Sequence, residues 1–218
     1  MKHSHGQLHH TTRRLRRLAG IAALAGTLTA AVSPPAHAKP DFVPPPVPAN
    51  LEVPTGHKAF LVGHAAGTQQ YICVFPGAPA PWAFFGPQAT LFNNNDRQLI
   101  THFLSPNPVE SGTPRATWQD SRDTSTVWAT AIASSTDPNF VAPGAIPWLL
   151  LQVVGAQEGP TGGHRLTGTT FIQRLTTAGG IAPATGCLLS TDIGKKALVP
   201  YTTDYFFYKA TESEGSDE

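Results

Sequence analysis

Short runs of alternating hydrophobic and polar residues fill most of this chain, between about residues 51 and 209. The runs are four to ten residues long, rich in β-branched and aromatic residues, and separated by Gly, Pro and Asn. Such runs are typical of strands joined by turns. Ten are present, at 58–63, 70–75, 82–85, 89–92, 99–104, 116–119, 127–133, 148–154, 166–175 and 201–208. They predict an all-β, single-domain fold, an antiparallel β-sandwich or barrel, with little helix outside the N-terminal segment.

Two of these runs differ from the alternating pattern. Residues 148–154 are almost continuously apolar, which predicts a central strand covered on both faces. Residues 125–135 are rich in alanine, so they are the best candidate for a helix of one or two turns. The helical alternative and the strand at 127–133 exclude each other, and the pattern leaves both open.

The N-terminal segment has the features of an export signal. Four arginines between residues 13 and 17 precede an apolar run at 18–32, and Ala36 and Ala38 supply a small-x-small cleavage pattern. We therefore expect a signal peptide over 1–38 and a secreted or periplasmic, cell-envelope protein. The apolar run is shorter than the roughly 20 residues of a transmembrane helix, so we expect no transmembrane anchor after cleavage. Both the Sec and the twin-arginine export routes stay open.

The two ends of the mature chain differ in composition from its centre. Residues 39–50 hold five prolines, which favours a semi-rigid linker or an arm laid on the surface. Residues 210–218 are rich in acidic residues and predict a disordered tail. We expect the folded β-rich domain to span 51–209 and neither end to bury apolar side chains.

The net charge and the distribution of basic residues bear on which partners the protein can bind. Once residues 1–38 are removed, ten basic residues remain against fourteen acidic ones, a net charge of about −4. The basic residues are scattered, whereas proteins that bind phosphate backbones carry them in a patch or stripe. The sequence therefore argues against nucleic acid as a partner.

The chain has two cysteines, Cys73 and Cys187. An exported protein meets an oxidising environment, in which a lone pair of cysteines is expected to form a disulfide. A reactive thiol is the alternative, but the sequence has no Cys-x-x-Cys motif to support it.

Four histidines remain after cleavage, at positions 57, 64, 102 and 164. No two have the close spacing that places two imidazoles on one side of a strand or helix, so we predict no metal site and no cofactor. Surface or turn positions are the interpretation we favour for the four histidines. If any is a catalytic group, we select His64 and His102, because each neighbours apolar strand residues.

A hydrolase would need a nucleophile or a pair of carboxylates. The Gly-x-Ser-x-Gly motif of many hydrolases is absent. Asp120 and Asp123 are close enough in sequence to act as the two carboxylates of a glycosidase. Residues 120–125 also have the composition of a turn whose Asp and Ser side chains bond to their own backbone, and this is the reading we favour.

Aromatic residues offer a different kind of site. Trp118 is bracketed by Arg115, Gln119 and Asp120, so we select it as the tryptophan to be exposed and to stack on a ligand ring. A place in the core is nevertheless the outcome we favour, because the residue fits the inward side of a strand as well as the outward one.

Several segments resemble one family in consistent order over about residues 53–209. They are GTQQYIC (67–73), AIPWLLL (145–151), GG (162–163), TFIQR (170–174), GGIAPATGC (179–187) and YTTDYFFY (201–208). Together they are similar to the secreted bacterial and fungal family named domain of unknown function 3455. The resemblance implies an exported β-rich domain with paired cysteines, and it implies no established reaction or catalytic residue.

These observations favour a non-catalytic role, as a binding or envelope-associated module with an extracellular or cell-envelope ligand. An extracellular, carbohydrate-active hydrolase that uses a carboxylate or histidine cleft is the alternative. The two differ in whether candidate side chains share a concave pocket.

Overall fold

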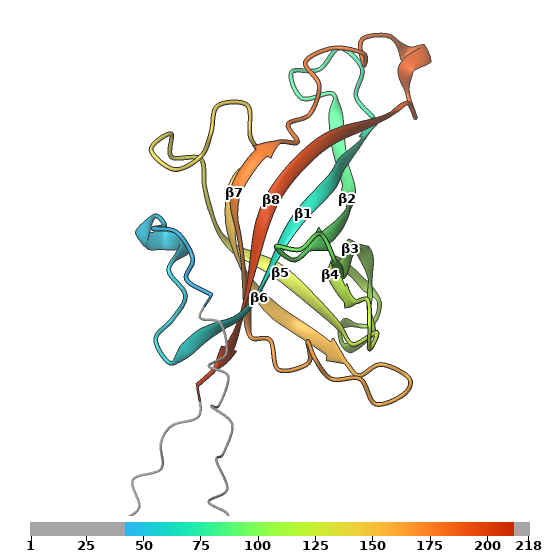
Figure 1. Cartoon of the computed structure of the whole chain (residues 1–218). Helices are drawn as coiled ribbons and strands as arrows, with labels where there is room; N and C mark the ends of the chain where they lie inside the picture. The colour runs from blue at the N-terminus through green and yellow to red at the C-terminus, as the bar shows by residue number, and fades with distance from the viewer. Residues whose placement is uncertain (1–41, 212–218) are drawn as a thin grey trace, which may run out of the picture. The chain divides into compact units, whose positions relative to one another are not determined.

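The computed structural model describes residues 42–211, so the signal peptide expected over 1–38 and nearly all of the acidic tail lie outside the described residues. The described part contains eight β-strands and three single turns of 3-10 helix (Figure 1). The strands are β1 (His57–Cys73), β2 (Trp82–Phe92), β3 (Gln98–Asn107), β4 (Thr113–Asp120), β5 (Thr126–Ser135), β6 (Trp148–Gln157), β7 (Phe171–Gly179) and β8 (Lys196–Ala210). The 3-10 turns are η1 (Ala49–Leu51), η2 (Pro108–Glu110) and η3 (Ser190–Asp192). Between residues 42 and 211, no helix has the length and apolar character needed to cross a membrane.

The eight strands form one antiparallel sheet that closes into a barrel. Each strand pairs with its neighbour in the chain, and β8 returns to pair with β1. The closing pair is long, running from His57 opposite Ala210 to Ile72 opposite Lys196. The all-β expectation is therefore confirmed, and of the two architectures predicted it is the barrel that forms.

The strands are fewer and longer than the sequence pattern predicts. The runs at 58–63 and 70–75 belong to the single strand β1, and those at 82–85 and 89–92 belong to β2. Gly63, Ala65 and Gly67 separate the two apolar halves of β1. These small residues allow β1 and β2 to approach closely: a Cβ at Gly67 would lie 2.1 Å from the carbonyl oxygen of Gln88.

The alanine-rich segment at 125–135 is a strand, so the helical alternative for it is wrong. Residues 126–135 form β5, which pairs with both β4 and β6. The cross-strand partners on both sides outweigh the helix propensity of the alanines, which is high for a residue type but is readily overridden by tertiary contacts. Register shifts at residues 128–129 and 131–133 bend the strand locally.

Because the strands alternate in direction, the loops gather in two groups at opposite ends of the barrel. The connections after β1, β3, β5 and β7 form what we call the disulfide end, and those after β2, β4 and β6 form the Leu166 end. Figure 1 shows the β1–β2 and β7–β8 connections together at the top of the view. Leu166 itself is fully buried and belongs to the apolar cluster inside the barrel.

Apolar side chains form two clusters, one on each side of the sheet. The inner cluster lies inside the barrel and includes Leu91, Ile100, Trp118, Leu166, Ile172, Tyr205 and Phe207. The outer cluster lies on the outward faces of β6, β7 and β8 and includes Leu51, Val141, Trp148, Leu150, Leu175, Phe206 and Tyr208. The strand β6 contributes to both clusters, which confirms the prediction that it is covered on both faces.

The N-terminal arm packs against the outer cluster. Phe42 and Val47 contact it, Leu51 is fully buried in it, and Val43 is 80% exposed. The Gln173 side chain fixes the arm by donating a 2.7 Å hydrogen bond to the Leu51 carbonyl. The expectation that the arm buries no apolar side chain is therefore wrong, because the outward faces of β6–β8 are apolar and need a cover.

Candidate functional site

A cavity of about 240 Å³ lies inside the barrel, toward the disulfide end. We call it the lumen pocket. Strands β1 to β8 all contribute to its wall. Near the other end the barrel is filled by Leu91, Ile100, Val127 and Leu166, each fully buried. The barrel therefore has one packed end and one hollow end.

Three aromatic rings in mutual contact form one wall of the lumen pocket. His102 of β3 and Trp118 of β4 are directly opposite one another in the register, and their rings stack at 4.2 Å with an interplanar angle of 12°. The Tyr205 ring of β8 meets both edge-on, at 5.1 Å from His102 and 5.4 Å from Trp118. The arrangement presents an aromatic surface to whatever occupies the pocket.

Trp118 is 1% exposed, so the exposed stacking platform is wrong and the place in the core, the outcome we favoured, is confirmed. Its polar neighbours suggested exposure, but successive residues of a strand point to opposite faces. Barrel closure encloses the face that Trp118 shares with Ala116. Its place in the pocket wall still allows contact with a ligand, now from inside the barrel.

His102 is held neutral in this wall. Its Nδ1 donates a 2.8 Å hydrogen bond to the Thr117 carbonyl, which leaves Nε2 as the acceptor nitrogen. Burial lowers the pKa of His102 to about 3, an effect that the Thr117 bond opposes and the charge of Arg174 reinforces. At neutral pH the ring is therefore an uncharged imidazole.

Two polar residues of the pocket, Arg174 and Gln69, were not singled out from the sequence, and neither was the indole nitrogen of Trp118. Arg174 of β7 donates from Nε and Nη2 to the Pro147 carbonyl, at 3.2 and 2.8 Å. Gln69 Nε2 and Trp118 Nε1 are buried and have no hydrogen-bond acceptor among the described residues. The sequence does contain a signal for Arg174. Alternation along strand β7 places Arg174 on the same face as the apolar Ile172, so a charged residue stands where an apolar one is expected.

The second candidate histidine, His64, lies outside the lumen pocket. It lines a separate depression of about 430 Å³, which we call the His64 groove, with Asp96, Asp204 and Thr176 among its walls. His64 Nδ1 lies 2.6 Å from Asp204 Oδ1, and Nε2 lies 2.6 Å from Asn94 Oδ1. The structure therefore does not bring His64 and His102 together.

The charge of His64 is favoured by these contacts. Partial burial lowers the pKa of His64, but the hydrogen bonds to Asp204 and Asn94 and the Asp204 charge outweigh it, so the pKa is raised. Asp204 also accepts a 2.6 Å hydrogen bond from Thr176. Since Asp204 stands between the hydroxyl and the imidazole, Thr176 is not activated by His64 as a nucleophile would be.

The carboxylates of Asp120 and Asp123 bind their own turn. Asp120 Oδ1 accepts from the backbone nitrogens of Arg122 and Asp123, and Oδ2 pairs with Arg165 at 2.9 Å. Asp123 Oδ1 accepts from the Ser125 nitrogen and hydroxyl, and Oδ2 accepts from the Arg165 nitrogen. The reading of this segment as a turn is confirmed, and neither carboxylate lines either pocket.

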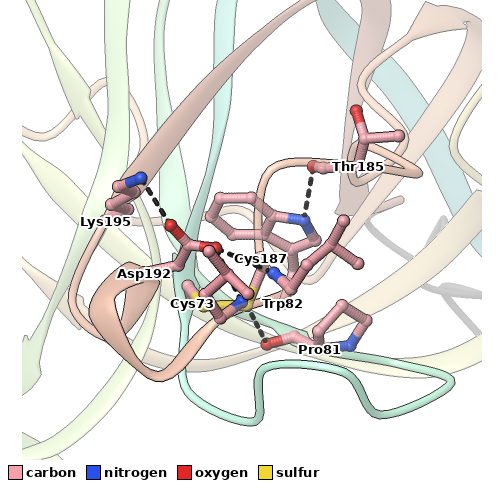
Figure 2. The surroundings of a disulfide bond; sticks show 9 residues. Cys73, Pro81, Trp82, Thr185, Cys187, Asp192 and Lys195 are labelled. Carbon is pink, nitrogen blue, oxygen red and sulfur yellow. Dashed lines mark hydrogen bonds and ion pairs between the residues drawn. A yellow bond between two sulfur atoms is a disulfide. The ribbon is translucent and has the colours of Figure 1, made fainter.

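The predicted disulfide between Cys73 and Cys187 is present, and it joins the end of β1 to the β7–β8 connection with 5.6 Å between the Cα atoms. Figure 2 shows the Trp82 ring beside the bridge, with its indole nitrogen donating to the Thr185 carbonyl at 3.3 Å. Asp192 accepts from the Leu188 and Leu189 nitrogens and pairs with Lys195. The bridge therefore sits in an ordered loop, and neither cysteine lines the lumen pocket.

Across residues 42–211, no group of three or more His, Cys, Asp or Glu side chains is arranged to hold a metal ion. The lumen pocket contains no carboxylate, and of the four histidines only His102 lines it. Its walls offer rings, an imidazole acceptor, N–H donors and two guanidinium groups. Chemically, they can enclose a small molecule and hydrogen-bond to it.

Comparison with known proteins places the chain in a family. No curated protein and no solved structure matches it. The family described as "Protein of unknown function (DUF3455)" matches residues 54–209, which is the barrel and both cysteines. The family suggested by the sequence segments is thus confirmed, and the chain belongs to the DUF3455 family.

Proposed function

We propose that this protein is an extracytoplasmic binding module that holds a small molecule in the lumen pocket. The observation that carries the proposal is the unequal filling of the barrel, packed with aliphatic side chains at the Leu166 end and hollow at the disulfide end. Eight-stranded barrels are just wide enough either to fill with side chains or to hold one small ligand. A cavity walled by aromatic rings with a few polar groups has the composition of a ligand site.

The extracytoplasmic part of the proposal rests on two features. The expected signal peptide over 1–38 would direct the chain out of the cytoplasm. The Cys73–Cys187 disulfide would be stable there, whereas cytosolic thiols are kept reduced. A soluble receptor or carrier associated with the cell envelope fits both features.

Binding is favoured over hydrolysis by the chemistry of the pocket wall. A hydrolase needs a nucleophile or water held beside a general base. His102 is the only histidine at the pocket, its ring is stacked on Trp118, and no described hydroxyl donates to it. The Asp120 and Asp123 carboxylates, which the hydrolase alternative would use, are engaged by Arg165 and by their own turn.

The proposal can be tested by blocking the pocket. The purified mature protein would be screened by thermal shift and calorimetry against small molecules, glycans and cell-envelope extracts. Ala131 and Ile132 are neighbours and both are exposed, but only Ala131 lines the pocket, so it lies at the rim. We expect Ala131→Trp to weaken binding of any hit by about tenfold or more, and Ile132→Trp to leave it unchanged.

Two results would contradict the proposal. Binding that survives Ala131→Trp in a protein of unchanged melting temperature would place the ligand elsewhere. Turnover of a hit that disappears on His102→Ala or Asp120→Asn, without unfolding, would establish the hydrolase alternative.

A further inference from the structure

We infer that the ligand of the lumen pocket is a small aromatic carboxylate, with its ring against Trp118 and its carboxylate at Arg174. The inference rests on the proposed function, because it names the chemical class that the same pocket would take. It is carried by three independent properties of the wall: an uncompensated positive charge, unpartnered donors, and the size and shape of the apolar space.

The charge of the pocket is one-sided. Two arginines line it and no Asp or Glu does. Arg115 is compensated, because Glu110 accepts from its Nε at 2.8 Å and from its Nη2 at 2.7 Å. Arg174 has only neutral groups beside it, the Pro147 carbonyl that accepts from it and the Tyr205 hydroxyl, and no described carboxylate forms an ion pair with it. A partly buried guanidinium without a counter-ion attracts an anion.

The unused hydrogen-bonding groups of the wall are donors, which also favours a ligand rich in acceptors. The buried nitrogens Gln69 Nε2 and Trp118 Nε1 each carry N–H groups that meet no acceptor in the described residues. A buried donor without an acceptor is unfavourable, so a ligand that supplies acceptor atoms gains free energy by meeting it. A carboxylate has two oxygens and only accepts hydrogen bonds, which matches donors on more than one wall residue.

The remaining wall is apolar and suits one ring. Ala116, Ala129 and Leu151 lie among the lining residues, together with the His102–Trp118–Tyr205 rings. The volume of about 240 Å³ is below the roughly 300–1,000 Å³ of most ligand pockets. A monocyclic acid fits this space, whereas a long acyl chain or a multi-ring compound exceeds it. Inorganic phosphate would satisfy the charge but leave the rings without contact.

The experiment compares isosteric ligands that differ in charge. Benzoate and phenylacetate would be titrated into the mature protein by calorimetry, with benzamide and phenylacetamide as neutral counterparts and inorganic phosphate as a ringless anion. We expect each carboxylate to bind about tenfold or more tightly than its amide, and phosphate to bind more weakly than either acid.

The matched variants are Arg174→Gln, in the pocket wall, and Arg97→Gln, outside it. Glutamine at position 174 keeps an N–H group for the Pro147 carbonyl and removes the charge. We expect Arg174→Gln to reduce benzoate affinity by about tenfold or more and to leave benzamide affinity unchanged. Arg97→Gln removes the same charge from an exposed residue that does not line the lumen pocket, so it should leave benzoate affinity unchanged.

Each outcome decides the matter. Equal affinity for benzoate and benzamide, or equal losses in the two arginine variants, overturns the inference and leaves the proposed function standing. Carboxylate binding that persists in Ala131→Trp overturns both. If Arg174→Gln does not fold, the ratio of acid to amide affinity in the unaltered protein still decides: a ratio near one overturns the inference, and about ten or more supports it.

Discussion

At the scale of single residues, His102 makes the stability of this protein depend on pH. Burial lowers its folded pKa to about 3, whereas an unfolded histidine has a pKa near 6.5. Below pH 6.5 the unfolded chain therefore binds a proton that the folded chain does not. The contribution of His102 is lost as pH falls from 6.5 toward 3.

We predict that His102 removes about 2 kcal/mol of unfolding free energy between pH 7 and pH 5. The measurement is urea unfolding at both pH values, for the unaltered protein and for His102→Asn. Asparagine can donate to the Thr117 carbonyl but does not titrate. The unfolding free energy that the His102→Asn variant loses between pH 7 and pH 5 should be smaller than that of the unaltered protein by about this amount. Equal losses would show that His102 is not buried in its neutral form.

His64 makes the stability depend on pH in the opposite direction. Its folded pKa is raised, so its contribution is fully present below the unfolded value near 6.5 and is lost as pH rises through the folded value. Only a protonated ring can donate to Asp204 and Asn94 at once.

We therefore predict that an NMR titration of His64 gives a pKa above 6.5 in the unaltered protein and below 6.5 in Asp204→Asn. The substitution removes the charge, and partial burial then dominates. The protection factors of residues 93–97 against hydrogen exchange, which correct for the intrinsic rise of exchange with pH, should also fall at pH above the raised pKa. An unchanged pKa in Asp204→Asn would refute the role of this pair.

How far single residues could be predicted from the sequence depended on whether their effects are local. The turn at Asp120 and Asp123 was predictable, because each carboxylate bonds to backbone within a few positions. The side of the sheet that Trp118 faces was not, because it depends on how the barrel closes. Gln69 and Arg174 acquire their common setting only when β1 and β7 come to line one cavity.

At the scale of elements, alternation predicted strands, but small residues obscured their lengths. Gly63 and Gly67 look like interruptions in the sequence, and in the barrel they are the inward positions of β1 beside β2. Alanine at 125–135 is equally ambiguous, and only pairing with β4 and β6 selects the strand. Such non-local pairing is what a single sequence pattern does not report.

The N-terminal arm yields a prediction at this scale. Leu51 ends η1, is fully buried in the outer cluster, and holds Gln173 through its carbonyl. We predict that Leu51→Ala lowers the free energy of unfolding by about 2–5 kcal/mol, because it leaves a cavity beneath the arm. Chemical denaturation of the mature protein measures this.

Val43→Ala is the matched control. Val43 belongs to the same arm and is 80% exposed, so its loss should cost no more than about 0.5 kcal/mol. A cost below about 1 kcal/mol for Leu51→Ala would mean that the arm is held loosely, and that removing residues 39–50 would be tolerated as the composition suggested.

At the scale of the whole barrel, the lumen pocket and the disulfide lie toward the same end. The bridge ties the β7–β8 connection to the last residue of β1, and backbone bonds already join the same segments, from Cys73 N to the Lys195 carbonyl and from Gly194 N to the Cys73 carbonyl, both at 2.9 Å. The native position of this loop thus does not depend on the bridge alone. The disulfide acts chiefly by restricting the unfolded chain.

We predict that the double variant Cys73→Ala, Cys187→Ala folds, loses about 4 kcal/mol of unfolding free energy, and binds lumen-pocket ligands with unchanged affinity. The bridged residues are 114 positions apart, and the chain-entropy model assigns a loop of this length about 4.8 kcal/mol, an upper figure because bridges commonly deliver less than the model gives. Affinity should persist because neither cysteine lines the pocket. Thiol titration of the unfolded, unreduced mature protein is the control, and it should find no reactive thiol. Two titratable thiols would show that the bridge does not form, and a loss of both stability and affinity would show that it also shapes the open end of the barrel.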